Sequence, residues 1–134
     1  MTPDRLSIRD ISQLWNDELR LGEEPSFWRV GDLLDDFRQR CSTPEEKYAL
    51  VRDVPVWLDA THADCNAYLA AVAETLCREA FLTPPSWTDA SPCFLHRPWF
   101  AGGFETLKAI LLVESPVAFR RRNLFVSANA LNRA

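Results

Sequence analysis

Apolar residues recur at helical spacing along most of the chain, and the first set is the clearest. Its members lie three or four positions apart, on one face of a helix: Ile8, Ile11, Trp15 and Leu19. Ser7 precedes the set and Asp10 follows three residues later, much as in a capping box, while Gly22 is a typical helix stop. The pattern predicts a first helix within residues 7–22.

A second amphipathic helix is predicted from Ser26, its expected cap, to about Cys41. Its apolar face is in register at helical spacing: Phe27, Val30, Leu33, Leu34, Phe37 and Cys41. The opposite face carries Asp32, Asp35 and Asp36, which we interpret as a solvated acidic face and not as a metal or acid–base site. The sequence Thr43-Pro44-Glu45-Glu46 is a strong helix start and predicts a third helix to about residue 52.

The longest helix is expected over about residues 62–81. Its predicted buried stripe consists of Leu69, Val72, Ala73, Leu76, Cys77 and Ala80. Alanine is frequent on its other positions, and small side chains let neighbouring helices approach closely. We therefore expect this helix to form the centre of a helical bundle.

The last third, residues 98–134, combines aromatic, glycine and arginine residues. Trp99 and Phe100 follow a proline and are interpreted as part of a rigid aromatic lid over the core. After a Gly102-Gly103 turn, one helix is predicted from Phe104 to the Ser-Pro break at residues 115–116. A short helix with Val117 and Phe119 inward should follow, and residues 124–126 fit a short strand or an extended apolar strap.

Together these elements predict an all-α fold. The expected architecture is a compact, single-domain bundle of about six helices with irregular aromatic-rich loops, covering residues 1–134. No apolar run approaches the roughly 18 residues that a membrane span needs. The first residues mix acidic and basic side chains and do not form a secretory signal, so we expect a cytoplasmic protein without membrane association.

Charge is distributed unevenly along the chain. The net charge is −4, but residues 1–91 hold 9 Lys and Arg against 17 Asp and Glu, whereas residues 92–134 hold 6 against 2. The overall acidity disfavours non-specific nucleic-acid binding as the main function. The basic end suits contact with an acidic surface, and the equally weighted alternative is that the two halves neutralise each other within the fold.

The sequence predicts no catalytic residues, no metal site and no cofactor. The four cysteines, Cys41, Cys65, Cys77 and Cys93, contain no closely spaced pair, and the two histidines, His62 and His96, are 34 positions apart. We interpret the cysteines as reduced, buried hydrophobes. No nucleophile with a base and an orienting group is recognisable, which leaves enzymatic activity uncertain and favours a non-catalytic protein.

The most distinctive polar feature of the sequence is a run of three consecutive arginines, Arg120, Arg121 and Arg122. Guanidinium groups bind carboxylates and phosphates in a bidentate manner, so the triplet is a candidate docking patch for an acidic protein or for RNA. In a helix, neighbouring residues are about 100° apart, so all three cannot face one ligand. The structural alternative is that one arginine clamps a helix end or the acidic half while the others are solvated.

Four segments resemble a group of small bacterial proteins in which they occur in the same order. They are AYLAAVAE (residues 67–74), PPSW (84–87), PWF (98–100) and ESPVAFRRRNLFV (114–126). Members of that group are found beside, or fused after, helix-turn-helix regulators, and some look like partners of nucleotidyltransferase-type toxins. The resemblance implies an accessory or antitoxin-like role. No helix-turn-helix module precedes residue 57, so direct operator binding is not implied.

From these observations we predict a non-catalytic protein-binding module, an antitoxin-like partner that masks a bacterial toxin. The candidate contact residues are two aromatic anchors and the basic triplet: Trp99, Phe100, Arg120, Arg121 and Arg122. The alternative is a nucleic-acid-associated regulator that uses the same arginines, and a weaker third hypothesis is a hydrolase or transferase with His96 in a closed pocket. Whether the chain forms a homodimer stays open.

Overall fold

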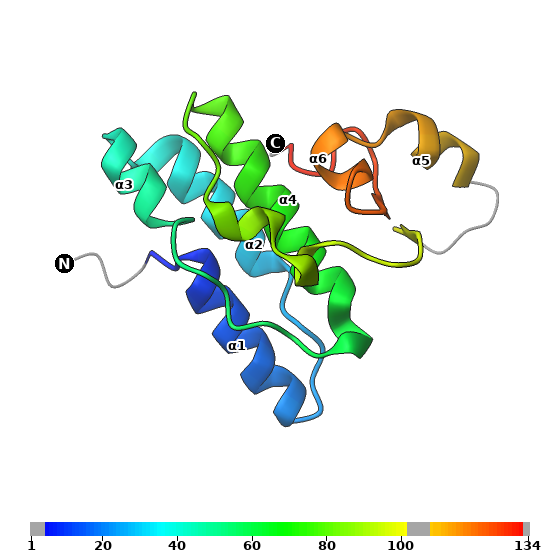
Figure 1. Ribbon diagram of the computed structural model, residues 1–134. Coiled ribbons are helices and arrows are strands. Elements are labelled where there is room, and N and C mark those ends of the chain that lie inside the picture. Colours follow the sequence, from blue (N-terminus) through cyan, green and yellow to red (C-terminus); the bar gives the residue numbers. More distant parts are fainter. Residues whose placement is uncertain (1–4, 102–107, 133–134) are drawn as a thin grey trace.

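The fold is built mainly from helices, as predicted. The computed structural model describes residues 5–101 and 108–132. Its elements are, in chain order, α1 (Ile8–Arg20), α2 (Trp28–Asp35), α3 (Pro44–Ala49), α4 (Ala63–Glu79), β1 (Trp99–Phe100), α5 (Lys108–Glu114), α6 (Val117–Arg120) and β2 (Leu124–Phe125). The all-α prediction is thus correct for the helices and omitted one short pair of strands (Figure 1).

Helix α1 begins and ends where its local sequence indicates. The Ser7 hydroxyl accepts a hydrogen bond from the Asp10 N–H at 3.1 Å, and the Asp10 carboxylate accepts one from the Ser7 N–H at 3.0 Å. These two bonds form the predicted capping box. After the last turn, Gly22 adopts a positive φ of 76°, a conformation that glycine reaches without strain.

Helix α2 differs from its prediction at both ends. Ser26 does not cap it, because the Ser26 N–H and hydroxyl both donate to the Glu18 carboxylate, and the helix begins at Trp28. At the other end α2 continues into a π-helical turn over Asp36–Arg40. This turn brings Asp36 into the interior, where it pairs with Arg40 at 2.7 Å, so the prediction of a solvated Asp36 is wrong.

Helix α4 is the centre of the structure, as expected. It lies in the middle of the ribbon and contacts α6, β2 and the 3₁₀ turns Ser86–Asp89 and Ser91–Cys93 (Figure 1). Because neighbours cover it on several sides, its buried residues extend well beyond one stripe: Cys65, Asn66, Ala67, Leu69, Ala70, Ala71, Val72, Ala73, Glu74, Leu76 and Cys77. The alanines permit this close packing, and one charged residue, Glu74, is buried among them.

The end of α4 holds a phenylalanine in a position that normally favours glycine. Phe81 has a φ of 58°, while the Leu82 N–H donates to the Cys77 carbonyl at 2.7 Å and the Phe81 N–H donates to the Arg78 carbonyl at 3.2 Å. These bonds form a Schellman motif with Phe81 at its left-handed residue. The Phe81 side chain is 97% exposed, so its packing does not compensate the backbone strain.

The C-terminal segment folds back onto α4 through a parallel strand pair. Trp99 pairs with Leu124 and Phe100 with Phe125, and the connection between the strands contains α5 and α6. Of the two alternatives for residues 124–126, the short strand is therefore confirmed. Phe119 is buried as predicted, but Val117 is 62% exposed, so its predicted inward position is wrong. Gly102, Gly103 and the predicted helix start at Phe104 lie outside the described residues.

The buried apolar residues form a core cluster that reaches from Ile8 to Leu131. Residues from α1, α2, α4, α6 and β2 contribute to it, so both ends of the described chain share one interior. All four cysteines are buried and unpaired, as the sequence interpretation predicted. Among the described residues, no helix is both long and apolar enough to cross a membrane.

The strain at Phe81 gives a prediction about stability. Replacing Phe81 by glycine should raise the free energy of unfolding by about 1 kcal/mol, because the left-handed conformation is unfavourable for residues with a Cβ atom. Chemical denaturation monitored by circular dichroism measures this change. Phe81→Ala is the matched control: it removes the ring, keeps the strain and should leave the stability nearly unchanged. An equal gain in both variants would contradict the explanation.

Candidate functional site

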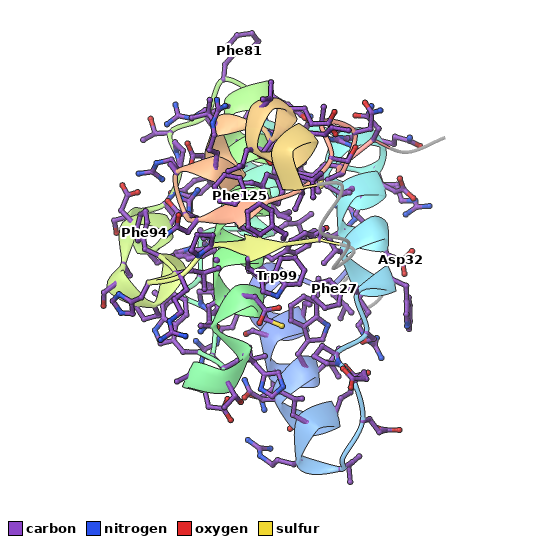
Figure 2. The ribbon with its side chains drawn as sticks, turned by 90° about the vertical axis from the view of Figure 1, so that its right-hand side faces the viewer. Phe27, Asp32, Phe81, Phe94, Trp99 and Phe125 are labelled. Atoms are coloured by element: carbon purple, nitrogen blue, oxygen red, sulfur yellow. The ribbon has the colours of Figure 1, made fainter. Side chains whose placement is uncertain are left out.

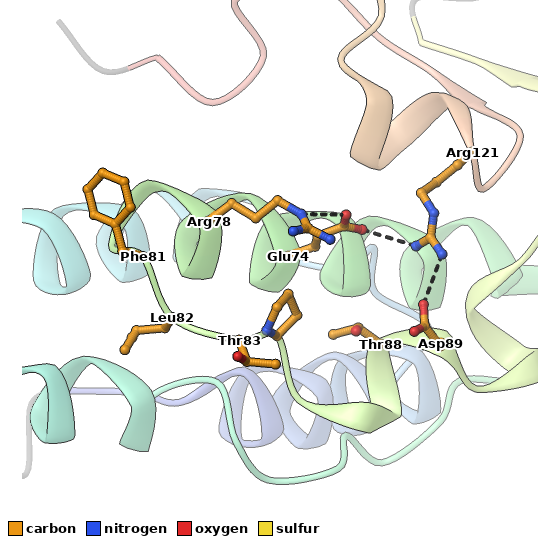
Figure 3. A pocket seen from close by; sticks show the side chains of 9 residues that line it. Glu74, Arg78, Phe81, Leu82, Thr83, Thr88, Asp89 and Arg121 are labelled. Carbon is orange, nitrogen blue, oxygen red and sulfur yellow. Dashed lines mark hydrogen bonds and ion pairs between the residues drawn. The ribbon is translucent and has the colours of Figure 1, made fainter.

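Glu74 holds three arginines around one buried carboxylate. Arg122 Nη1 donates to Glu74 Oε1 at 2.6 Å, Arg121 Nη1 donates to the same oxygen at 3.1 Å, and Arg78 Nε donates to Oε2 at 3.0 Å. Figure 3 shows the more exposed part of this cluster, where Glu74 lies between Arg78 and Arg121. We call Glu74, Arg78, Arg121 and Arg122 the Glu74 cluster.

Arg122 belongs to the interior. Its side chain is 1% exposed, and it also donates to the backbone carbonyls of Ala118 at 2.5 Å and Thr88 at 2.9 Å. Among the described residues, no acceptor lies within hydrogen-bonding distance of its Nε atom. Arg122 therefore joins the C-terminal segment to α4 and to the 3₁₀ turn that contains Thr88. This is the structural role that the sequence left as an alternative.

The other two arginines of the triplet have different surroundings. Arg121 is partly exposed and bridges Glu74 and Asp89, with an Arg121 Nη2–Asp89 Oδ1 distance of 3.0 Å. Arg120 is exposed and forms no ion pair with any described residue. The three side chains thus diverge around the helical turn, as the 100° spacing predicted. In this fold they do not form one docking patch.

The Glu74 carboxylate is held in its charged form. Burial raises the pKa of Glu74, but hydrogen bonds from Arg122 and Arg78 and the charges of Arg122 and Arg121 outweigh that effect, so the pKa lies below its usual value. Burial lowers the pKa of Arg122 despite the pairing with Glu74, yet an arginine remains protonated in proteins. At neutral pH Glu74 is therefore ionised.

A polar pocket of about 410 Å³ adjoins the Glu74 cluster. Its lining includes Arg78, Phe81, Thr88, Asp89 and Arg121, several of which appear in Figure 3. The charged groups here already neutralise one another: Arg78 pairs with Glu74, and Arg121 with Glu74 and Asp89. A ligand would have to displace these ion pairs, so the pocket offers no preformed charge for binding or catalysis. His96 is exposed and does not line this pocket.

Burial also determines the protonation state of three of the cysteines. Burial raises the pKa of Cys65 to about 12 and those of Cys77 and Cys93 to about 11, which keeps these thiols protonated at neutral pH. In the described part of the chain, no three or more His, Cys, Asp or Glu residues gather as metal ligands would. Elsewhere on the molecule, large aromatic side chains are exposed around a surface depression.

Such a surface lies where α2, α4 and the strand pair meet. Two hollows of about 300 and 340 Å³ share Phe27, Tyr68 and Ala130 in their linings. Trp99 lines the first hollow, together with Leu124 and Val126, and Trp28 lines the second. We call the two hollows together the aromatic groove. Figure 2 shows the molecule from the side of the aromatic groove, with Phe27, Trp99 and Asp32 labelled.

A chain of ring contacts connects the aromatic groove to the core. The ring of Phe27 lies 4.7 Å from that of Trp15 and 5.3 Å from that of Tyr68, and Tyr68 in turn lies 5.6 Å from Phe119. Trp15 and Phe119 are fully buried. Edge-to-face and tilted ring pairs of this kind fix side-chain orientation, so the wall between the two hollows is held by the interior.

The two predicted aromatic anchors occupy different positions. Trp99 is 41% exposed and lines the aromatic groove, whereas the half-buried Phe100 stacks on Phe125 with ring centroids 5.0 Å apart and is absent from the groove lining. Neighbouring strand residues point to opposite faces, which explains this separation. The predicted aromatic lid is therefore a strand that presents one ring to the groove and packs the other against β2.

Sequence reasoning missed the other exposed aromatics of the groove. Trp28 is 64% exposed and Phe27 is 43% exposed, although Phe27 was expected in the core. One signal was present in the sequence. Trp28 does not fit the apolar register of the second helix, and it follows the Glu-Glu-Pro connection at residues 23–25 by three positions. A large aromatic residue outside the buried face of an amphipathic helix indicates an exposed ring.

Comparisons with known proteins do not assign the chain to a family or a function. No protein-family model matches the chain, and neither a curated protein nor a solved structure matches it significantly.

The Glu74 cluster leads to a prediction about stability. Glu74→Gln should lower the free energy of unfolding by about 3 kcal/mol, because it leaves the buried Arg122 guanidinium without a counter-charge. Arg121→Gln is the matched comparison. Since Arg121 is partly exposed, its loss should cost less than about 1 kcal/mol. Denaturant titrations of both variants test the difference, and similar losses would show that Glu74 acts through Arg121 and not through Arg122.

The lowered pKa of Glu74 predicts a specific pH dependence. A carboxylate whose pKa is lower in the folded state contributes stability above its unfolded pKa, about 4.3 for glutamate, and loses it as the pH falls through the folded value. The stability difference between the wild type and Glu74→Gln should therefore be constant near neutral pH and shrink below about pH 4. Unfolding curves between pH 7 and pH 3 measure it, and a constant difference across that range would contradict the lowered pKa.

Proposed function

We propose that this chain is a non-catalytic protein-binding module whose contact surface is the aromatic groove. The observation that carries the proposal is the exposure of Phe27, Trp28 and Trp99 around two adjoining hollows, of which the one at Trp99 is almost entirely apolar. Tryptophan in particular is enriched among the residues that dominate protein–protein binding energy. Contiguous exposed apolar surface is also uncommon unless another molecule covers it.

The most concrete form of this proposal is an antitoxin-like partner of a bacterial toxin, cytoplasmic like its target. Its support is the resemblance described above, which covers roughly residues 57–134, to a group of small bacterial proteins of which some look like partners of nucleotidyltransferase-type toxins. The groove supplies apolar anchors, and the exposed Arg120 supplies a charge for pairing with an acidic residue of the partner. Arg121 contributes only if it exchanges Asp89 for a partner acid. Arg122 acts indirectly, by holding the C-terminal segment in place.

The arrangement favours a protein over a nucleic acid as the partner. Nucleic-acid binding depends on several free Lys or Arg side chains along one surface. Arg122 is buried against Glu74, and Arg121 is neutralised by Glu74 and Asp89. The charged residues that line the aromatic groove, Asp32 and Asp64, are acidic and would repel phosphate.

The proposal predicts which substitutions abolish partner binding. A tagged Trp28→Ala/Trp99→Ala double variant should bind the partner captured from the native host at least about 30-fold more weakly than the wild type, since loss of a hot-spot residue costs about 2 kcal/mol or more. Titration calorimetry with the purified partner measures the change. Phe81→Ala is the control, because it removes an even more exposed ring outside the groove and should leave the affinity unchanged.

A second readout tests the antitoxin-like role itself. The captured partner should arrest growth when produced alone, and co-production of the wild-type chain, but not of the double variant, should restore growth. All variants are first checked for cooperative unfolding. Binding of the double variant with wild-type affinity would overturn the groove as the contact surface. Recovery of nuclease-sensitive nucleic acid in place of a protein would overturn the protein-binding proposal.

A further inference from the structure

We propose that the aromatic groove takes two neighbouring side chains of the protein partner that differ in polarity. One is a large apolar side chain, which enters the hollow at Trp99, and the other is a Lys or Arg, which enters the adjoining hollow at Trp28. The pairing rests on the proposed function and names the chemistry of the partner's contact residues. It follows from the different linings of the two hollows and from the sign of their charges.

The hollow at Trp99 is almost entirely apolar. Apart from Asp64, its lining residues are aromatic or aliphatic, among them Phe27, Tyr68, Trp99, Leu124 and Val126. Its volume of about 300 Å³ lies at the lower end of the range of ligand pockets, so it suits one side chain and not a larger ligand. A polar group in apolar surroundings loses its hydration, which costs free energy unless a hydrogen bond replaces it. A large apolar side chain is therefore the occupant that this hollow favours.

The adjoining hollow, of about 340 Å³, is mainly polar. It shares Phe27, Tyr68 and Ala130 with the first hollow, and its lining also includes Asp32 and Asn132, both of which are exposed. An apolar side chain placed here would cover polar groups without replacing their contacts with water. A side chain that donates hydrogen bonds does replace them. Because the two hollows share lining residues, this polar side chain lies beside the apolar anchor.

The charges around both hollows are complementary to a cation. Asp64 lines the first hollow and Asp32 the second, and no described Lys or Arg lines either one. Neither of the two carboxylates forms a hydrogen bond or an ion pair with another described residue. A Lys or Arg of the partner therefore gains a counter-charge at this position, whereas an Asp or Glu would be repelled.

One cation of the chain itself lies close to the second hollow without filling it. The Arg29 guanidinium lies 4.5 Å from the centre of the Trp28 ring, and its Nε donates to the Ser26 hydroxyl at 2.7 Å. Arg29 is absent from the lining of the hollow, so Asp32 keeps its unpaired charge. The contact also shows that the Trp28 ring accepts a guanidinium group, which is the favoured cation for aromatic faces.

The apolar anchor and the cation have separate roles in this arrangement. Burial of a large apolar side chain supplies most of the affinity, because exposed ion pairs contribute little on their own. The aspartates select the sign of the partner's charge and speed its approach. Substitutions in the two hollows should therefore have effects of different size and different salt dependence.

The experiment selects peptides from a displayed library of random 12-residue sequences on the full-length wild-type chain. Enriched sequences should share one large apolar residue with a Lys or Arg close to it. A representative peptide is synthesised, labelled and titrated by fluorescence anisotropy against variants that unfold cooperatively. Trp99→Ala should weaken its binding at least about tenfold, because it removes one wall of the apolar hollow. Asp32→Asn should weaken binding about two- to fivefold at low salt and less at high salt, since exposed charges are screened.

Double-mutant cycles then test which peptide residue enters which hollow. Replacing the Lys or Arg of the peptide by Gln should have little further effect in the Asp32→Asn variant, and replacing its apolar residue by Ala should have a reduced effect in the Trp99→Ala variant. The crossed combinations should be close to additive. Glu45→Gln is the matched control: it removes one charge from an exposed position of α3 outside the groove lining and should leave binding unchanged.

The outcomes separate this inference from the proposed function. Peptides that require Trp99 but carry an acidic or neutral residue beside the anchor, or that show no coupling to Asp32, would overturn the cationic contact and leave the groove as the binding surface. A pool without any Trp99-dependent peptide would overturn the inference as a whole, while the native partner's response to Trp28→Ala/Trp99→Ala decides the proposed function independently. Enrichment of peptides that couple their apolar residue to Trp99 and their cation to Asp32 supports the inference.

Discussion

The buried pair of Glu74 and Arg122 is the interaction on which the C-terminal half of the structure depends. Taking two charges out of water is costly, and the pair compensates this only through close geometry and additional hydrogen bonds. Arg122 meets those conditions by bonding to Glu74 and to two backbone carbonyls, which belong to separate segments. One guanidinium group thus fixes α6 and the Ser86–Asp89 turn on α4 at the same point.

The aromatic groove is a consequence of this anchoring. Its walls come from α2 and α4 on one side and from β1, β2 and Ala130 on the other. Only when the C-terminal segment is docked on α4 does Trp99 lie in the same depression as Phe27 and Tyr68. Within the arginine triplet, which looked like the contact site, Arg122 therefore serves the proposed site by positioning it. The proposed contacts fall to aromatic side chains from three distant parts of the chain.

Local sequence determined the features that could be predicted, and distant partners determined the others. The capping box at Ser7 and Asp10 and the start of α3 at Thr43 depend on residues within one turn, so both were recognised. The burial of Asp36 depends on a π-helical turn, and that of Arg122 on a glutamate 48 positions away. Phe27 fits the apolar register of the predicted helix, yet it precedes the first residue of α2 and lines the groove. Periodicity carries no information about such pairings.

The pairing of residues far apart in sequence also has a kinetic consequence. Arg38, next to α2, donates to the backbone carbonyl of Leu131, a separation of 93 positions, and β1 cannot pair before β2 exists. Closing such long loops costs chain entropy before any contact compensates it, which slows folding. On the ribosome, the groove can form only after the residues up to Asn132 have emerged. A nascent chain that stops short of Ala130 therefore lacks part of the surface that we propose for binding.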